Sequence, residues 1–65
     1  MHHLAFEVDT RHAVEQAHDF ARDGGFRVLD APASYENYSA GYYAMYLLDP
    51  DGLKVEIAHI PVPTS

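Results

Sequence analysis

The chain has 65 residues, no cysteine and a formal net charge of −6. A single domain of this length buries only about 60% of the surface its unfolded form exposes, so we expect self-association to add stability. The missing cysteine excludes disulfides, thiolate zinc sites and cysteine nucleophiles. The fixed cations are too few for the basic stripe that a nucleic acid or an anionic membrane requires: Arg11, Arg22, Arg27 and Lys54.

The sequence carries no signal-peptide pattern and no apolar run near the roughly 20 residues that a membrane-spanning helix needs. Together with the absent cysteine, this predicts a cytoplasmic protein. We therefore expect neither a nucleic acid nor a membrane as its partner.

The first predicted strand covers residues 3–8, where strand-forming Phe6 and Val8 alternate with other residue types. Because successive strand side chains point to opposite faces, Leu4, Phe6 and Val8 share one face. We expect that apolar face to lie beneath a helix, which turns His3 toward the other face of the sheet.

A helix is predicted over residues 11–23, where apolar residues recur at helical spacing. Asp9 and Thr10 offer side-chain oxygens that can cap its first turn. Gly24 and Gly25 end it, since glycine tolerates the left-handed conformation of a helix C-terminus.

Three further strands are predicted over residues 26–30, 42–48 and 53–60. The first two are separated by a loop, residues 31–41, that is rich in turn residues and tyrosine. The last two are joined by Asp-Pro-Asp-Gly at residues 49–52, where proline presets the first turn angle and glycine takes the positive one.

The predicted fold is therefore α+β, with the order β-α-β-β-β and one helix on one face of a mixed sheet. Residues 1–60 form this single module, and residues 61–65 form a flexible tail.

The last strand places Glu56 on the same sheet face as His3. Its apolar alternate residues belong beneath the helix: Leu53, Val55 and Ile57. An imidazole and a carboxylate on one face are half of a divalent metal site, and two ligands cannot hold a catalytic metal by themselves.

In the third strand, alternation leaves open which residues share that helix-free face. The two candidate sets are Tyr42, Ala44, Tyr46 and Leu48, or Tyr43, Met45 and Leu47. Either set makes the face apolar and aromatic, which calls for a partner. We predict a homodimer through this face, and more specifically one that encloses a cavity there.

The aromatic strand at 42–48, the Asp-Pro-Asp-Gly turn and the glutamate four residues after its glycine form a recognisable motif. With the opening His-Leu-Ala-Phe-Glu-Val strand and the Gly-Gly-Phe-Arg-Val-Leu segment at 24–29, it resembles the second half of a glyoxalase/bleomycin-resistance/extradiol-dioxygenase protein. This is the vicinal oxygen chelate superfamily, and the resemblance runs from His3 to about His59.

The resemblance implies a βαβββ module, two of which normally enclose a metal cavity. It matches His3 to the first-strand metal ligand and Glu56 to the last-strand ligand. Tyr46, ten residues before Glu56, matches a cavity-facing tyrosine of the dioxygenase branch, which would select the Tyr42 set for the cavity. The candidate catalytic residues are thus Glu56 and Tyr46.

Only one module is present, so the resemblance implies that two copies pair. His3 and Glu56 of each copy would form a two-His, two-Glu site for a divalent ion such as Ni, Zn, Mn, Fe or Co. The ion would chelate vicinal oxygens of a small substrate while Glu56 moves a proton, as in glyoxalase-type isomerases, epimerases and lyases.

Simpler interpretations remain open beside this one. The module could be a non-catalytic, bleomycin-resistance-like binder of a small molecule, or an inactive half that only dimerises. His3 could be an exposed strand residue and Glu56 a solvated carboxylate. Tyr35 and Tyr38 could form a lid over the cavity or be ordinary loop aromatics.

Overall fold

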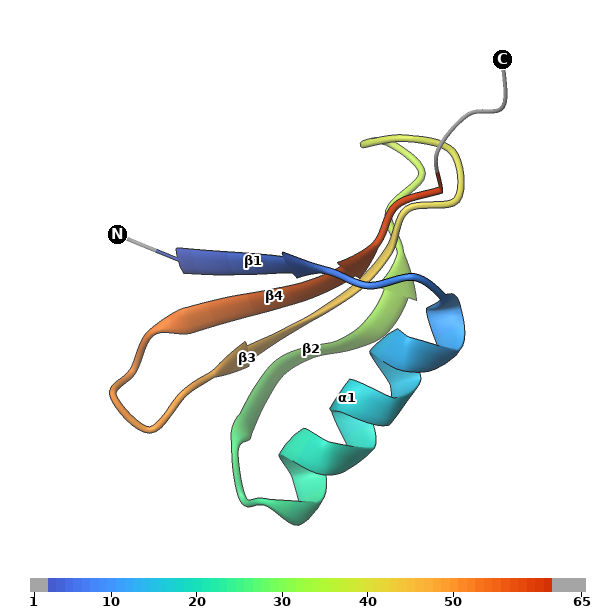
Figure 1. Ribbon diagram of the computed structural model, residues 1–65. Helices are drawn as coiled ribbons and strands as arrows, with labels where there is room; N and C mark the ends of the chain where they lie inside the picture. Colours follow the sequence, from blue (N-terminus) through green and yellow to red (C-terminus); the bar gives the residue numbers. More distant parts are fainter. Residues whose placement is uncertain (1–2, 62–65) are drawn as a thin grey trace.

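The computed structural model describes residues 3–61, residue 3 by its backbone alone (Figure 1). The order of elements is the predicted β-α-β-β-β. The elements are β1 (His3–Glu7), α1 (Arg11–Asp23), β2 (Arg27–Ser34), β3 (Tyr43–Leu48) and β4 (Lys54–His59). Of the predicted tail, only Pro61 falls within the described residues.

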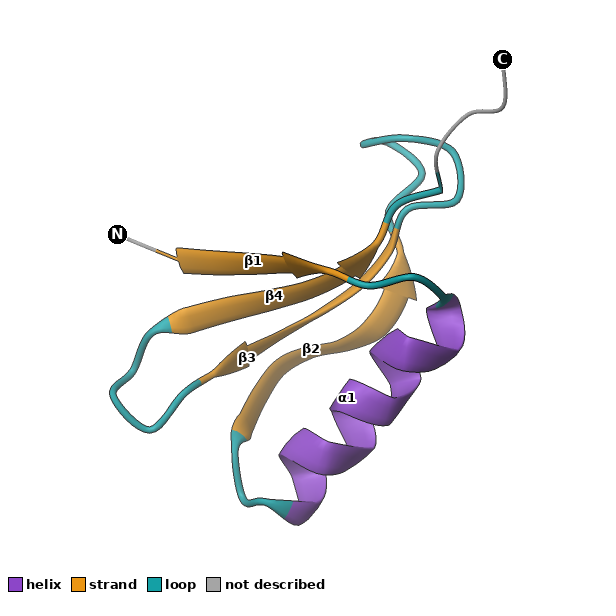
Figure 2. Ribbon diagram, in the orientation of Figure 1, coloured by secondary structure: helices purple, strands orange, loops and turns teal. Residues whose placement is uncertain are grey.

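The four strands form one mixed sheet in the order β1-β4-β3-β2. β1 pairs with β4 in parallel, whereas β4 with β3 and β3 with β2 are antiparallel. Figure 2 shows α1 against one face of this curved sheet, with the other face open. The predicted α+β fold is confirmed, and the first and last strands, β1 and β4, lie side by side.

Local signals set the ends of α1 as expected. The Thr10 hydroxyl accepts a hydrogen bond from the Ala13 backbone N–H at 3.0 Å, which satisfies an otherwise unpaired donor of the first turn. At the other end, the Gly24 N–H donates to the Phe20 carbonyl at 2.9 Å, and Gly25 takes a positive φ of 76°.

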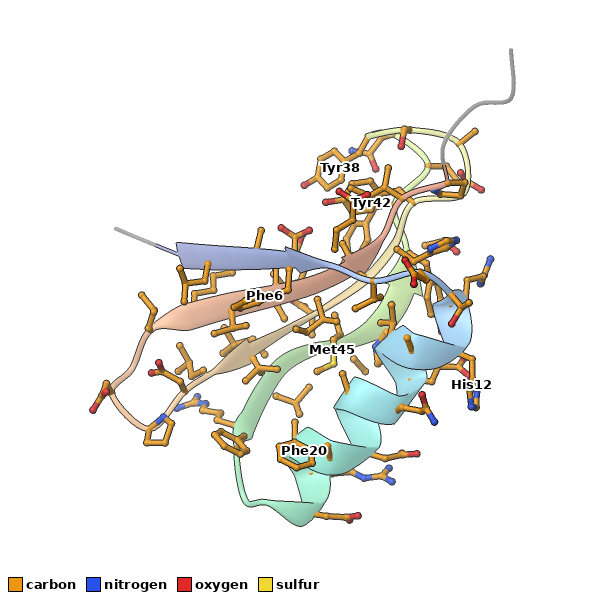
Figure 3. The ribbon with its side chains drawn as sticks, viewed as in Figure 1. Phe6, His12, Phe20, Tyr38, Tyr42 and Met45 are labelled. Atoms are coloured by element: carbon orange, nitrogen blue, oxygen red, sulfur yellow. The ribbon has the colours of Figure 1, made fainter. Side chains whose placement is uncertain are left out.

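The apolar core lies between α1 and the sheet. Met45 is fully buried there (Figure 3). Val14 is fully buried as well, and Ala21 and Tyr43 join the same cluster. Met45 therefore faces the helix, and strand alternation turns its neighbours toward the open face. This decides between the two candidate sets of the third strand: the helix-free face carries Tyr42, Ala44, Tyr46 and Leu48.

The prediction that Leu4 and Phe6 lie beneath the helix is wrong. Their side chains are 48% and 51% exposed, and only Val8 packs against the core. Within residues 3–61, α1 packs on β2, β3 and β4 but does not reach β1. A single helix cannot cover all four strands, so the apolar face of the edge strand stays open.

The second strand is longer than predicted, because β2 continues through Pro32 to Ser34 instead of ending at Asp30. β2 is an edge strand, where proline costs no hydrogen bond to a further strand. Its register with β3 shifts on both sides of Asp30, which accommodates the irregular segment.

The turn between β3 and β4 has the predicted chemistry. Asp49 Oδ1 accepts from the backbone N–H groups of Asp51 and Leu53, and Gly52 takes a φ of 84°. No helix among the described residues has the length and apolar character to cross a membrane.

Candidate functional site

Glu56 lies at the centre of the helix-free face. It belongs to β4, which runs between β1 and β3, and it is paired in register with Ala5 on one side and Tyr46 on the other. Its side chain is only 6% exposed, although it is ionisable. Burying a carboxylate is costly unless hydrogen bonds compensate for lost water, so Glu56 requires hydrogen-bond donors among its neighbours.

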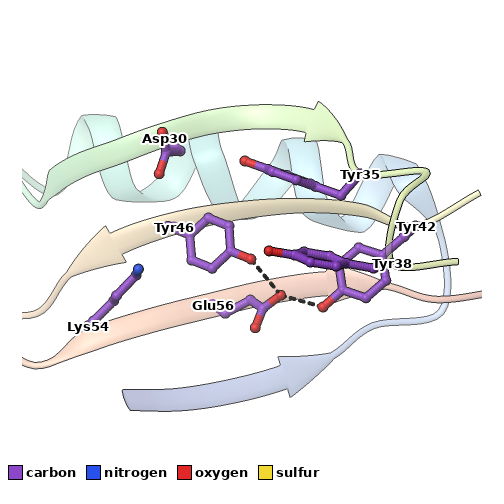
Figure 4. A pocket seen from close by; sticks show the side chains of 7 residues that line it. All are labelled: Asp30, Tyr35, Tyr38, Tyr42, Tyr46, Lys54 and Glu56. Atoms are coloured by element: carbon purple, nitrogen blue, oxygen red, sulfur yellow. Dashed lines mark hydrogen bonds between the residues drawn. The ribbon is translucent and has the colours of Figure 1, made fainter. Parts of the chain in front are cut away.

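Two tyrosine hydroxyls provide that compensation (Figure 4). Tyr42 Oη donates to Glu56 Oε2 at 2.5 Å, and Tyr46 Oη donates to the same oxygen at 3.0 Å. Hydrogen bonds to a charged acceptor are shorter and stronger than neutral ones. The two phenols therefore hold the carboxylate in one orientation on the open face.

The contacts with Glu56 also raise the pKa of each of the two phenols. The hydrogen bond to Glu56, followed by burial, raises the pKa of Tyr42 to about 12. Burial, followed by the hydrogen bond to Glu56, raises the pKa of Tyr46 as well. Both phenols thus remain protonated at neutral pH and act as hydrogen-bond donors.

A tyrosine cluster surrounds the carboxylate. Tyr35 stacks on Tyr38 with ring centroids 5.7 Å apart and planes 13° apart. Tyr35 also meets Tyr42 and Tyr46 edge to face, at 6.4 and 5.9 Å. These spacings lie in the range of favourable aromatic pairs.

The cluster lines a pocket of about 590 Å³ on the helix-free face, a volume typical of small-molecule sites. Its lining is completed by charged residues of β2 and β4. The full lining is Asp30, Tyr35, Tyr38, Tyr42, Tyr46, Lys54 and Glu56. The Lys54 ammonium lies over the Tyr46 ring, 4.9 Å from its centroid.

The loop between β2 and β3 positions two of these tyrosines. The Tyr35 N–H donates to the Tyr42 carbonyl at 2.8 Å, and the Tyr38 N–H donates to the Tyr35 carbonyl at 3.0 Å. Gly41 closes the loop with a φ of 78°, and a Cβ there would lie 2.8 Å from Pro61 Cγ. The loop is therefore an ordered part of the pocket wall.

Comparison with known proteins identifies the family. A family model described as glyoxalase/bleomycin resistance protein/dioxygenase superfamily matches residues 1–57. The chain belongs to this superfamily. The search of curated proteins gave no match.

Several solved structures share the fold. A glyoxalase/bleomycin resistance protein/dioxygenase family enzyme from Burkholderia phytofirmans is 28% identical, with a TM-score of 0.80 over 94% of this chain and 46% of its own. A protein from S. aureus is 22% identical, with a TM-score of 0.77 over 91% of this chain and 49% of its own. A glyoxalase/bleomycin resistance protein/dioxygenase from Alicyclobacillus acidocaldarius is 13% identical, with a TM-score of 0.68 over 91% of this chain and 46% of its own. The chain spans about half the length of these structures.

Metals are usual in the superfamily, and the side chains of this chain determine whether one could be held. Within residues 3–61, no group of three or more His, Cys, Asp or Glu side chains could hold a metal ion. Glu56 is a suitable oxygen donor, and the backbone of His3 lies opposite Lys54 on the adjacent strand. One copy of the module thus offers at most half of a donor set.

The structure brings two of the predicted site residues together, since Tyr46 donates directly to Glu56. The side chain of His3 falls outside the described residues, so its role as a metal ligand stays a prediction. Sequence reasoning placed Tyr42 with Tyr46 in the set of cavity residues but did not assign it as a second donor to Glu56. It missed Asp30 as part of the pocket.

Proposed function

We propose that the chain forms one half of a metal-dependent, glyoxalase-type cavity that acts on a small, oxygen-chelating substrate. The observation that carries this proposal is Glu56, a carboxylate 6% exposed that two tyrosine hydroxyls hold on the open face of the sheet. A buried carboxylate that hydrogen bonds hold in place on an open face is a costly arrangement and is typical of a functional site.

The proposed metal donors are His3 and Glu56 from two copies of the chain. In register, His3 lies two positions before Ala5, the residue that pairs with Glu56. Residues so related on neighbouring strands are diagonal neighbours, within reach of a common ion for long side chains. A two-fold axis beside β1 would add an equivalent pair and complete a four-ligand site.

Exposed apolar side chains support a second copy at the β1 edge. Leu4 and Phe6 are about half exposed, and β1 is an outer strand of the sheet. An uncovered apolar edge strand is a favourable surface for another chain. Two modules joined along this edge would combine their helix-free faces into the cavity predicted above.

In that cavity a bound divalent ion would act as a Lewis acid on vicinal oxygens of the substrate. One of the two Glu56 carboxylates, no longer a metal ligand, would take a proton from a substrate carbon and return it. Tyr46, kept protonated at neutral pH, would donate a hydrogen bond to Glu56 and limit the carboxylate to one orientation. The tyrosine cluster would exclude water from the reacting atoms. An isomerase, epimerase or lyase fits these groups equally.

A second candidate is a metal-free binding module of the bleomycin-resistance kind. The tyrosine cluster around the pocket favours it, because aromatic rings hold ligands without any metal. Metal binding separates the two candidates.

The test is the metal content of the purified chain after loading with Ni²⁺, Mn²⁺, Fe²⁺ or Zn²⁺ and removal of excess ion. We expect about one ion per two chains and a dimer by light scattering. His3→Ala and Glu56→Gln should each lower metal affinity at least tenfold.

Matched controls are His12→Ala and Asp51→Asn, which remove an imidazole and a carboxylate at exposed positions on α1 and on the β3–β4 turn. Both should bind metal as the parent does. A parent chain that binds none of these ions would rule out the metal-dependent function and leave the metal-free module.

A further inference from the structure

The pocket has a feature that a carboxylate site alone does not require, namely four aromatic rings in mutual contact on one side of it. The ring centroids of Tyr38 and Tyr42 are 5.2 Å apart, and the Tyr35 ring contacts the other three rings. Figure 4 shows these rings and the Glu56 carboxylate around the same space. Ring faces carry negative electrostatic potential, so a group of them attracts cations.

The charged residues that line the pocket also favour a cation. Its lining contains two carboxylates, Asp30 and Glu56, and one ammonium, Lys54, which leaves an excess of one negative charge. The chain as a whole has a net charge of −6. Both the local and the overall potential therefore favour a positively charged ligand.

The chain itself contains an example of this recognition. The Lys54 ammonium lies 4.9 Å from the centroid of the Tyr46 ring, within the distance at which a cation is attracted to an aromatic face. A ligand cation would meet the remaining rings of Tyr35, Tyr38 and Tyr42, on the side of Glu56 where these rings gather.

A flat neutral ring fits the cluster less well. Inserting a ring between two parallel rings needs about 7 Å, twice the usual carbon contact distance. Tyr35 and Tyr38 are parallel within 13°, but their centroids are only 5.7 Å apart, so they leave no slot between them. A compact group that touches ring faces and edges from outside suits the pocket better.

We propose that the tyrosine cluster binds a substituted ammonium group, and that the substrate of this site carries such a group beside its oxygens. This inference rests on the proposed function only in taking the pocket as the substrate site. The ammonium would contact the rings of Tyr35, Tyr38 and Tyr42, while the oxygen-bearing end would lie at Glu56.

The probe is choline, compared with 3,3-dimethyl-1-butanol, which has the same shape without the charge. Both are titrated calorimetrically into the parent chain in metal-free buffer containing a chelator. We expect choline to bind at least about fivefold more tightly than the neutral alcohol. Equal affinity, or tighter binding of the alcohol, would overturn the proposal.

Ring and charge variants locate the binding. Tyr38→Leu should weaken choline binding at least about threefold, whereas Tyr38→Phe, which keeps the ring, should leave it within twofold. Tyr38 is 61% exposed on a loop, so its replacement should not unfold the chain. Phe20→Leu is the control, since Phe20 is an exposed aromatic residue on α1, outside the pocket.

Asp30→Asn should weaken choline binding, and Asp51→Asn, which changes the net charge equally outside the pocket, should not. Equal weakening in both variants would contradict a localised site. Because the titrations are metal-free, their outcome is independent of metal content. A chain that binds metal but not choline keeps the proposed function and loses this inference, and the reverse outcome keeps only the inference.

Discussion

The two faces of the sheet use the same strands for different purposes. On β3, Met45 faces α1 and is fully buried among apolar side chains, while Tyr46, the next residue, faces the pocket and donates to Glu56. On β4, Ile57 packs against the core, and its neighbour Glu56 carries the buried carboxylate. One face stabilises the fold, and the other holds polar groups that the fold must compensate for.

A short chain can thus carry a site on the same sheet that forms its core. Its core contains few fully buried large side chains, so the domain has little stability to spare. The site is therefore built on the back of the core strands, where Tyr42 adjoins the buried Tyr43 and Tyr46 adjoins the buried Met45. Substitutions on the two faces should separate stability from binding.

The largest expected effect is on the helix side. Met45→Ala should lower the free energy of unfolding by about 2–5 kcal/mol, because it leaves a cavity at a fully buried position. Urea denaturation followed by circular dichroism measures this. Met45→Leu, which preserves volume, should cost less than about 1.5 kcal/mol. Equal losses in both variants would contradict a closely packed core.

On the pocket side, Glu56→Gln should lower the free energy of unfolding by only about 1–2 kcal/mol. The two phenols would then donate to a neutral amide oxygen instead of a carboxylate, and such hydrogen bonds are weaker. Its larger effect should be the loss of metal binding. A variant that is more stable than the parent would mean that the phenols do not offset the burial of the carboxylate.

Alkaline pH should lower the free energy of unfolding through a phenol of the pocket. The pKa of Tyr42 is raised to about 12 from its ordinary 10.0, chiefly by the hydrogen bond to Glu56. The folded chain therefore binds its phenolic proton more tightly than the unfolded chain, and this contribution to stability is present below pH 10. It should be lost as pH rises from 10 to 12. Urea titrations across this range measure the loss, which should be smaller in Tyr42→Phe.

The smallest effect on monomer stability is expected at the open edge. Phe6→Ser should change the free energy of unfolding of the monomer by less than about 0.5 kcal/mol, because this side chain is already 51% exposed. If a second copy covers β1, however, the same substitution should raise the dimer dissociation constant at least tenfold. Light scattering on dilution measures this, with Leu29→Ser on the opposite edge strand as the control. Equal dissociation constants for the two variants would place the partner elsewhere.

Much of this arrangement follows from strand alternation and turn chemistry. The apolar positions of the last strand put Glu56 on the open face, and the Asp49 turn sets the register that pairs it with Tyr46. Alternation could not choose between the two tyrosine sets of β3, because both are apolar and aromatic. The burial of Met45 beneath α1 decided the choice, and the pairing of Tyr46 with Glu56 agrees with it.

Other features lay beyond sequence patterns. Leu4 and Phe6 look like core residues, but their exposure depends on where α1 crosses the sheet, which is a property of the whole fold. Pro32 indicates a loop, yet an edge strand tolerates it. Asp30 reaches the pocket only because the register of β2 shifts on both sides of it.

Metal-induced stabilisation measures whether binding belongs to the helix-free face and stability to the other face. The unfolding temperature is measured with and without saturating Ni²⁺ for the parent, Glu56→Gln and Val14→Ala. An ion that binds only the folded state raises that temperature according to its affinity. We expect Val14→Ala to unfold at a lower temperature but keep the Ni²⁺-induced rise, and Glu56→Gln to lose the rise. A rise in Glu56→Gln equal to that of the parent would contradict a metal site at Glu56 on the helix-free face.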